Sequence, residues 1–97
     1  MKVFLYDNRF ELGIGLFASA KGYKLVSAGL SETPEAVTNN GSMIYGYIHE
    51  VDQDVLDMMD TYYGLGVKLH ERIEIDAVLA GGVKVKAQMY EFNMEIA

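Results

Sequence analysis

The sequence contains no cysteine and no tryptophan, and it has a single proline. Without cysteine, the chain cannot form disulfides, thiolate nucleophiles or thiolate metal sites. This composition suits a reducing compartment, and we predict a cytoplasmic protein. No apolar run approaches the ~20 residues that a membrane-spanning helix needs. The apolar run near the N-terminus stops at Asp7, far short of the core of a signal peptide. We therefore expect no association with a membrane.

Basic residues are also scarce. Eight lysines and arginines face fourteen aspartates and glutamates, which gives a formal net charge of −6. The basic residues nowhere form a run, so a nucleic acid is not an expected partner. A chain of 97 residues is long enough for one hydrophobic core but not for two. We expect a single domain over residues 1–97.

The residue types that carry metal or nucleophilic chemistry are few. His49 and His70 are the only histidines, and neither has a carboxylate or a second histidine at ligand spacing. We interpret both as solvated strand residues and predict no metal and no cofactor. No serine lies in a nucleophile-elbow context. The isolated pairs Gly13-Ile14-Gly15 and Gly64-Leu65-Gly66 do not predict a phosphate-binding loop.

The stretch from residue 42 to residue 64 is the most informative part of the sequence. Aromatic and β-branched residues at Met43–Val51 predict a strand. A helix follows, with Asp52 as its N-cap, acidic Asp54 in its first turn and Gly64 directly after its end. Residues at helical spacing give it one apolar face, made of Val55, Leu56, Met59, Tyr62 and Tyr63. Any pocket should be lined from this strand and helix.

The remaining pattern predicts an α+β protein. Strands are expected at Val3–Tyr6, Tyr23–Ala28, Val67–Leu79 and Val83–Phe92, and the last two are joined by a turn at Gly81-Gly82. The glycine-containing stretch Phe10–Ala20 and the polar stretch Ser31–Gly41, with Pro34 and Asn39-Asn40, are expected to be loops, each with at most a helical turn. These elements favour a small, mostly antiparallel β-barrel of five to six strands with one main helix packed against it.

Glu71 departs from the alternating pattern of its strand. It shares the parity of Leu69 and Ile73, so a regular strand would direct its side chain to the core. A buried carboxylate would have a raised pKa and could act as an acid or a base. The alternative, which we favour, is a bulge that turns Glu71 to solvent.

The order of several motifs resembles that of the γ-glutamylcyclotransferase-like superfamily. The chain opens with Val3–Tyr6, continues with the glycine-containing strand at residues 45–51, and has a helix that ends Met59–Gly64. His70–Ile75 and Ala87–Tyr90 follow. The resemblance covers nearly the whole chain and rests on order and spacing. It implies a small β-barrel with flanking helices. It also implies an enzyme that releases 5-oxoproline by intramolecular attack of a γ-glutamyl amine on its own side-chain amide.

The resemblance also shows where this chain departs from the family pattern. The family's substrate-holding loop reads Tyr-Gly-Thr-Leu, and here Tyr6 is followed by Asp7, Asn8 and Arg9. Tyr63 stands where the family has its catalytic glutamate, and a phenol with a pKa of ~10 is a poor base near neutrality. Both changes weaken the family reaction, because it needs a carboxylate in hydrogen-bond reach of the attacking amine and preorganised donors for the amide oxygen.

Three interpretations follow. The first is an inactive barrel that binds a small molecule or a protein at the former active-site pocket, at the barrel mouth. The expected ligand-binding residues are Tyr6, Asp7, Asn8, Arg9, Tyr63, Arg72 and Tyr90. The second is an active cyclotransferase in which Asp7, Asp60 or Glu71 replaces the glutamate. The third is a protein-interaction module whose pocket is filled by Tyr63 and neighbouring aromatic residues. The oligomeric state is open.

Overall fold

The computed structural model describes residues 1–27 and 34–93. They form five strands, one α-helix and one short 3₁₀ helix. In chain order these are β1 (Lys2–Leu5), β2 (Leu16–Ser27), β3 (Pro34–Glu50), α1 (Gln53–Tyr62), η1 (Leu65–Val67), β4 (His70–Leu79) and β5 (Lys84–Phe92). None of the helices in the described part of the chain is long and apolar enough to cross a membrane.

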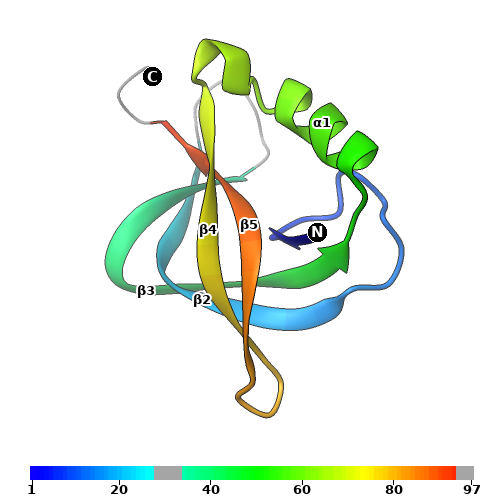
Figure 1. Cartoon of the computed structure of the whole chain (residues 1–97). Helices are drawn as coiled ribbons and strands as arrows, with labels where there is room; N and C mark the ends of the chain where they lie inside the picture. The colour runs from blue at the N-terminus through cyan, green and yellow to red at the C-terminus, as the bar shows by residue number, and fades with distance from the viewer. Residues whose placement is uncertain (28–33, 94–97) are drawn as a thin grey trace.

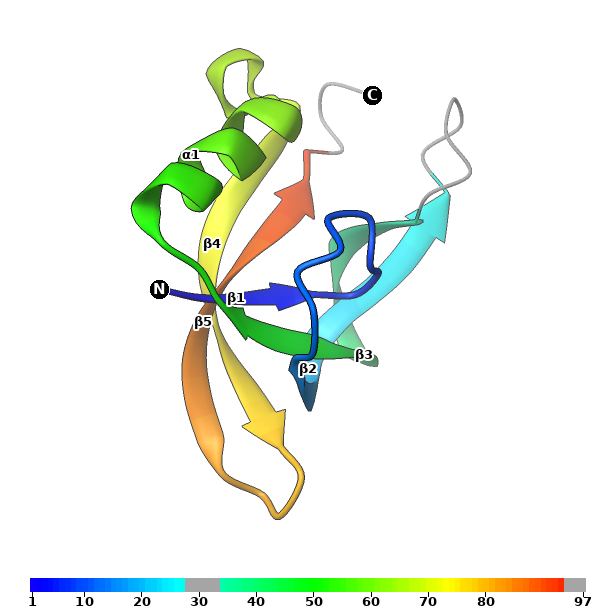
Figure 2. The same ribbon diagram turned by 90° about the vertical axis from the view of Figure 1, so that its right-hand side faces the viewer.

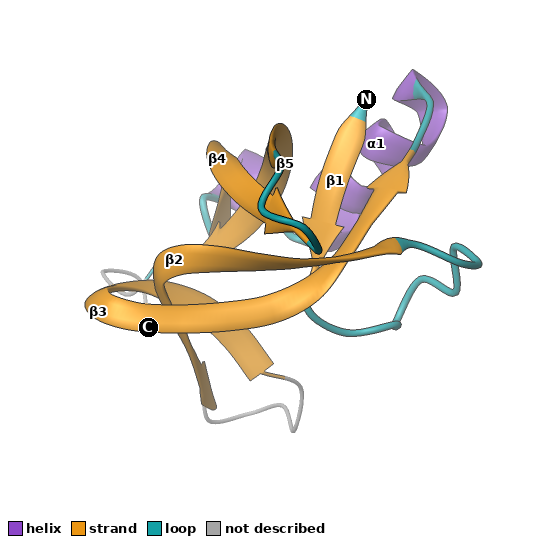
Figure 3. Ribbon diagram, turned by 90° about the horizontal axis from the view of Figure 1, so that it is seen from below, coloured by secondary structure: helices purple, strands orange, loops and turns teal. Residues whose placement is uncertain are grey.

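The five strands close into a barrel with the order β1-β3-β2-β4-β5, and β3 also pairs with β5. The β2–β3, β1–β3, β2–β4 and β4–β5 pairs are antiparallel, whereas β5 pairs in parallel with β1 and β3. Helix α1 lies at one end of the β4–β5 hairpin (Figures 1 and 3). The long β2–β3 ribbon curves behind this hairpin in the view of Figure 1. The predicted α+β barrel with one main helix is confirmed.

The β2–β3 ribbon is much longer than the sequence pattern predicts. Leu16–Ala20 and residues 34–41 are strand, so both predicted loops are wrong over these residues. Ser31 and the end of the predicted strand at Ala28 lie outside the described residues. The pairing register shifts between Lys21 and Tyr23, opposite residues 39–42 of β3. The turn-forming residues near Gly41 therefore mark a bulge that bends the ribbon, because bulges insert unpaired residues into a continuing strand.

Two apolar clusters stabilise the barrel, one inside it and one under the helix. Alanines fill much of the interior, since a five-stranded barrel leaves little room for large side chains; the interior cluster is Phe4, Ala18, Ala20, Ala36, Ile44, Ile48, Ile75, Ala77, Ala87 and Met89. The second cluster packs α1 against the outer face; it contains Val3, Leu5, Val51, Leu56, Met59, Tyr63 and Tyr90. Strand β1 contributes to both clusters and is buried on both faces, with Phe4 in the interior cluster and Val3 and Leu5 under the helix.

Helix α1 begins and ends at the predicted residues. The Asp52 carboxylate accepts a hydrogen bond from the backbone N–H of Val55 at 2.9 Å. Gly64 follows the helix in the left-handed conformation, with φ of 70°. Leu56 and Met59 are buried, as predicted. The prediction is wrong for Tyr62, which is 57% exposed and contacts Phe10 with its ring edge.

Glu71 is exposed, as favoured, but the expected bulge is absent. The β4–β5 ladder is regular from His70, opposite Phe92, to Val78, opposite Lys84. Glu71 lies beside Glu91 and Thr38 in a hollow at the edge of the barrel, where an inward-facing side chain still meets solvent. The position of Glu71 near the strand's end, rather than an irregular backbone, therefore exposes it.

Candidate functional site

The loop between β1 and β2 places a half-buried ion pair near the end of the barrel. The Arg9 guanidinium donates to Asp7 through Nε, at 2.9 Å from Oδ2, and donates to the carbonyl oxygen of Pro34 at 3.3 Å. The Arg9 side chain is only 12% exposed. Figure 2 shows this loop beside the start of β3. Arg9 therefore ties the loop to the first residue of β3.

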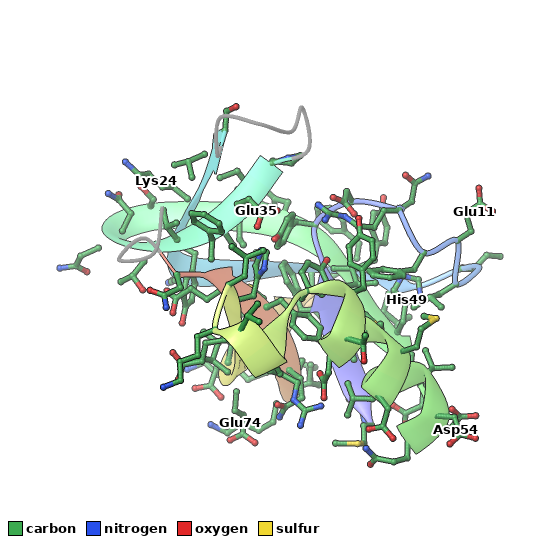
Figure 4. All side chains as sticks on the ribbon, turned by 90° about the horizontal axis from the view of Figure 1, so that it is seen from above. Glu11, Lys24, Glu35, His49, Asp54 and Glu74 are labelled. Carbon is green, nitrogen blue, oxygen red and sulfur yellow. The ribbon has the colours of Figure 1, made fainter. Side chains whose placement is uncertain are left out.

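A second pair, this one buried, joins Glu35 to His70. Glu35 lies at the start of β3, far from His49 near the strand's other end (Figure 4). Its carboxylate accepts from Nε2 of His70, and Nδ1 of His70 donates to the carbonyl oxygen of Tyr63 at 2.7 Å. Each ring nitrogen of His70 therefore faces an oxygen atom, one from a side chain and one from the backbone. The prediction that His70 is solvated is wrong, because it is 8% exposed.

Tyr63 connects these two pairs. Its side chain is 2% exposed, its ring stacks on Tyr90 at 4.1 Å between centroids, and the Arg9 guanidinium lies 5.4 Å above its ring centroid. Burial, followed by the nearby Tyr6, raises the pKa of Tyr63 far above its usual value. This shift favours the neutral phenol over the phenolate.

Arg72 and Tyr90 hold the helix rather than the loop. Arg72 donates to Asp60 at 3.0 Å, and the Tyr90 hydroxyl donates to the same carboxylate at 2.6 Å. Because Asp60 belongs to α1 and its partners to β4 and β5, this cluster fastens the helix to the hairpin. The structure thus brings Tyr6, Asp7, Arg9 and Tyr63 together but directs the polar groups of Arg72 and Tyr90 to Asp60.

A groove of about 570 Å³ lies beside the β1–β2 loop. The residues lining it come from the loop and from the outer faces of β2 and β3: Tyr6, Asp7, Asn8, Gly13, Ile14, Gly15, Phe17, Tyr45, Gly46, Tyr47 and His49. Gly46 is required at its position, since a Cβ atom there would lie 2.3 Å from the carbonyl oxygen of Leu5. The groove therefore adjoins the loop that the sequence singled out, but Tyr63 is not among the residues that line it.

His49 is half-buried at one end of this groove. Burial lowers the pKa of its imidazole below the usual value, which favours the neutral ring. Gly15 leaves room for the ring, because a Cβ atom at Gly15 would lie 2.8 Å from it. Within residues 1–27 and 34–93, no three His, Asp or Glu side chains gather to hold a metal ion.

A family model described as "Gamma-glutamyl cyclotransferase, AIG2-like" matches residues 10–96. The chain belongs to this family. The match covers most of the chain and confirms the superfamily that the order of motifs indicated. No curated protein gave a significant match.

Solved structures of the same fold support this placement of the AIG2-like chain. One is a "Gamma-glutamyl cyclotransferase" (TM-score 0.79, 18% identity). The match covers 96% of this chain and 66% of that one. Another is from Arabidopsis thaliana (TM-score 0.80, 18% identity, 97% of this chain and 69% of that one). A third is YkqA from Bacillus subtilis (TM-score 0.73, 22% identity, 95% and 35%). At these identities the likeness concerns the fold, and this chain is the shorter one each time.

Glu35 is the site residue that the sequence analysis missed. It lies in the stretch predicted to be a polar loop, where a glutamate is normally solvated. It is buried because β3 already begins at Pro34 and carries Glu35 toward His70. No local signal marks it, since its two partners are separated from it by 26 and 35 residues.

Proposed function

We propose that this AIG2-like chain is not a cyclotransferase and instead binds a small molecule or a protein in the groove beside Tyr6, Asp7 and Asn8. The observation that carries the proposal is the position of Arg9. Its guanidinium covers the Tyr63 ring, at the family's glutamate position, and is held there by Asp7. The site in which the family reaction would take place is therefore occupied by the protein's own side chains.

The carboxylates considered as replacements for the glutamate have other partners or lie elsewhere. Asp7 pairs with Arg9, and Asp60 accepts from Arg72 and Tyr90. Glu71 lies in a different hollow, with Lys24 and Glu91. A general base must be within hydrogen-bond reach of the proton it removes, and the contacts of Asp7 and Asp60 direct these carboxylates to other groups. These contacts favour a barrel without cyclotransferase activity, and the absence of cysteine fits a cytoplasmic location.

Release of 5-oxoproline from several γ-glutamyl amines tests the loss of activity. We expect no turnover above the uncatalysed rate, from either the natural chain or Tyr63→Glu. The variant restores the family's carboxylate but leaves Asp7 and Arg9 in the loop, so the substrate-holding element stays altered. Tyr63→Phe is the matched control, because it keeps the ring without adding a charge. Turnover by the natural chain, abolished by mutation of Asp7, Asp60 or Glu71, would disprove the proposal.

Binding in the groove needs a separate measurement. Backbone amide shifts of the labelled protein, recorded during titration with a small-fragment library, should change at Gly15, Phe17, Tyr47 and His49. Shifts confined to other surfaces would contradict the groove as the binding site. Such shifts would instead support the third interpretation, a protein-interaction module with a filled pocket. The packing of Arg9 against the Tyr63 ring is the observation that supports this interpretation.

A second candidate function is an active cyclotransferase that uses Glu35. The supporting observation is that this buried carboxylate lies 3.9 Å from Arg9 and joins His70, which bonds to Tyr63. Through Arg9 and His70, Glu35 is thus linked to Tyr63, which stands at the family's glutamate position. If this candidate holds, the natural chain releases 5-oxoproline, Glu35→Gln reduces turnover at least a hundredfold, and Glu71→Gln leaves turnover unchanged. Absence of turnover in the natural chain rejects it.

A further inference from the structure

Three aromatic rings stand in contact on the outer face of β2 and β3, at the groove. Phe17 and Tyr45 lie parallel, with 5.9 Å between centroids and 7° between planes. Tyr47 meets Phe17 edge-on at 5.7 Å and 71°. The three residues remain 50%, 58% and 49% exposed. Large aromatic side chains are usually more buried than this, and neighbouring exposed rings mark a surface suited to a ligand.

The groove offers these rings in a setting without free positive charge. No lysine or arginine is among its described lining residues, and Asp7, its one charged residue, is paired with Arg9. Burial lowers the pKa of the His49 imidazole, which favours its uncharged form. The whole chain carries a formal net charge of −6. The surroundings therefore disfavour an anionic ligand and attract a cation at long range.

The geometry points to an organic cation, a substituted ammonium group, as the ligand of this groove, held against the exposed aromatic surface that Phe17, Tyr45 and Tyr47 form. An ammonium is attracted to the face of an aromatic ring when it lies within about 6 Å of the centroid. The Phe17 centroid lies 5.9 Å from that of Tyr45 and 5.7 Å from that of Tyr47, so a cation seated on one of these exposed rings has a second ring nearby. This inference rests on the proposed use of the groove for binding and names the class of its ligand.

The parallel rings also argue against a flat neutral ligand between them. A flat ligand that stacks between two rings needs the rings to be roughly twice the usual stacking distance apart. Centroid distances of 4.5–7 Å are instead typical of two rings that contact each other directly. Phe17 and Tyr45 at 5.9 Å leave no such slot. A compact ammonium group resting above the rings needs none. The contacts with the rings then distinguish a cation from an uncharged group of the same shape.

Choline and its uncharged isostere 3,3-dimethylbutan-1-ol are the probes. Each is titrated into the protein, with binding followed by amide shifts at residues 15–17 and 45–49. We expect choline to bind about tenfold more tightly than the alcohol, from two- to fivefold per ring. Phe17→Leu and Tyr47→Leu should remove most of this preference, because they keep apolar bulk but lose the ring. Tyr47→Phe should retain it, and Val83→Ala, on the distant hairpin turn, is the unchanged control.

Two results would overturn the inference and keep it separate from the proposed function. Equal binding of choline and the alcohol in the groove would show that the groove binds ligands without selecting cations, which leaves the proposed function intact. If neither probe shifts the groove resonances, the organic cation is rejected. The 5-oxoproline assay and the fragment titration then decide the proposed function independently. Circular dichroism of each variant confirms that it is folded.

Discussion

Four charged or ionisable side chains, Asp7, Arg9, Glu35 and His70, are largely withdrawn from water at the end of the barrel, each less than a quarter exposed. Taking such groups out of water is costly, and their attraction offsets the cost only when every group has a partner. Here Arg9 forms ion pairs with both carboxylates. His70 contacts the Glu35 carboxylate and the Tyr63 carbonyl oxygen. Each of the four side chains has a partner only when the other members of the network are present.

Removing one member should therefore be costly. Glu35→Ala leaves His70 and Arg9 without their shared carboxylate, and we expect a loss of ~3–5 kcal/mol in the free energy of unfolding. Urea denaturation followed by circular dichroism measures it. Glu74→Ala is the matched control on β4, where the side chain is exposed, and should change stability by less than about 0.5 kcal/mol. Similar losses for both variants would show that the Glu35 pairs contribute little.

Helix α1 connects the second apolar cluster to the site. Its N-terminus is capped by Asp52, its inner face buries Leu56 and Met59, and its last turn delivers Tyr63 beneath Arg9. The contact of Asp60 with Arg72 and Tyr90 fixes the helix to the β4–β5 hairpin. The helix thus determines where Tyr63 lies, and its packing can be tested separately from the site.

The two neighbouring methionines of α1 provide that test. Met59 is fully buried, so Met59→Ala should lower the free energy of unfolding by ~2–5 kcal/mol through lost burial and an incompletely closed cavity. Met58 is 51% exposed, and Met58→Ala should cost less than about 1 kcal/mol. Chemical denaturation of both variants gives the comparison. Equal losses would contradict the observed orientation of the helix.

The molecule as a whole depends on keeping several phenols neutral. Burial raises the pKa of Tyr6, Tyr63 and Tyr90 well above the usual ~10; the charge of Glu35 adds to it for Tyr6, and the hydrogen bond to Asp60 for Tyr90. In the unfolded chain these groups ionise near pH 10. Their contribution to stability is therefore fully present below about pH 10 and is lost as the pH rises toward the folded-state values.

Stability should accordingly be constant from pH 8 to about 9.5 and fall steeply above about pH 10. Denaturation midpoints across this range test the expectation. The tyrosinate absorbance of the three buried rings should appear together with the loss of circular dichroism. Tyr63→Phe removes one of the three groups and should make the fall shallower. A midpoint that is independent of pH up to 12 would contradict the buried, neutral state of these tyrosines.

Local sequence patterns determined the elements whose stability is itself local. The cap at Asp52, the left-handed glycine at Gly64 and the turn at Gly81-Gly82 depend on residues a few positions apart, so period and residue type are enough to predict them. The α+β barrel class and the family followed from the order of such elements.

Only the tertiary structure decided what pairs across the barrel. Asn39-Asn40-Gly41 is a turn signal in isolation, yet pairing with β2 makes it a bulge in one continuous strand. Glu35 and His70 have the composition of surface residues, yet the closure of the barrel brings them together across 35 positions and buries both. The exposure of Phe17, Tyr45 and Tyr47 likewise depends on which strand face the helix covers. The burial or exposure of these side chains is a property of the assembled barrel, and no local pattern encodes it.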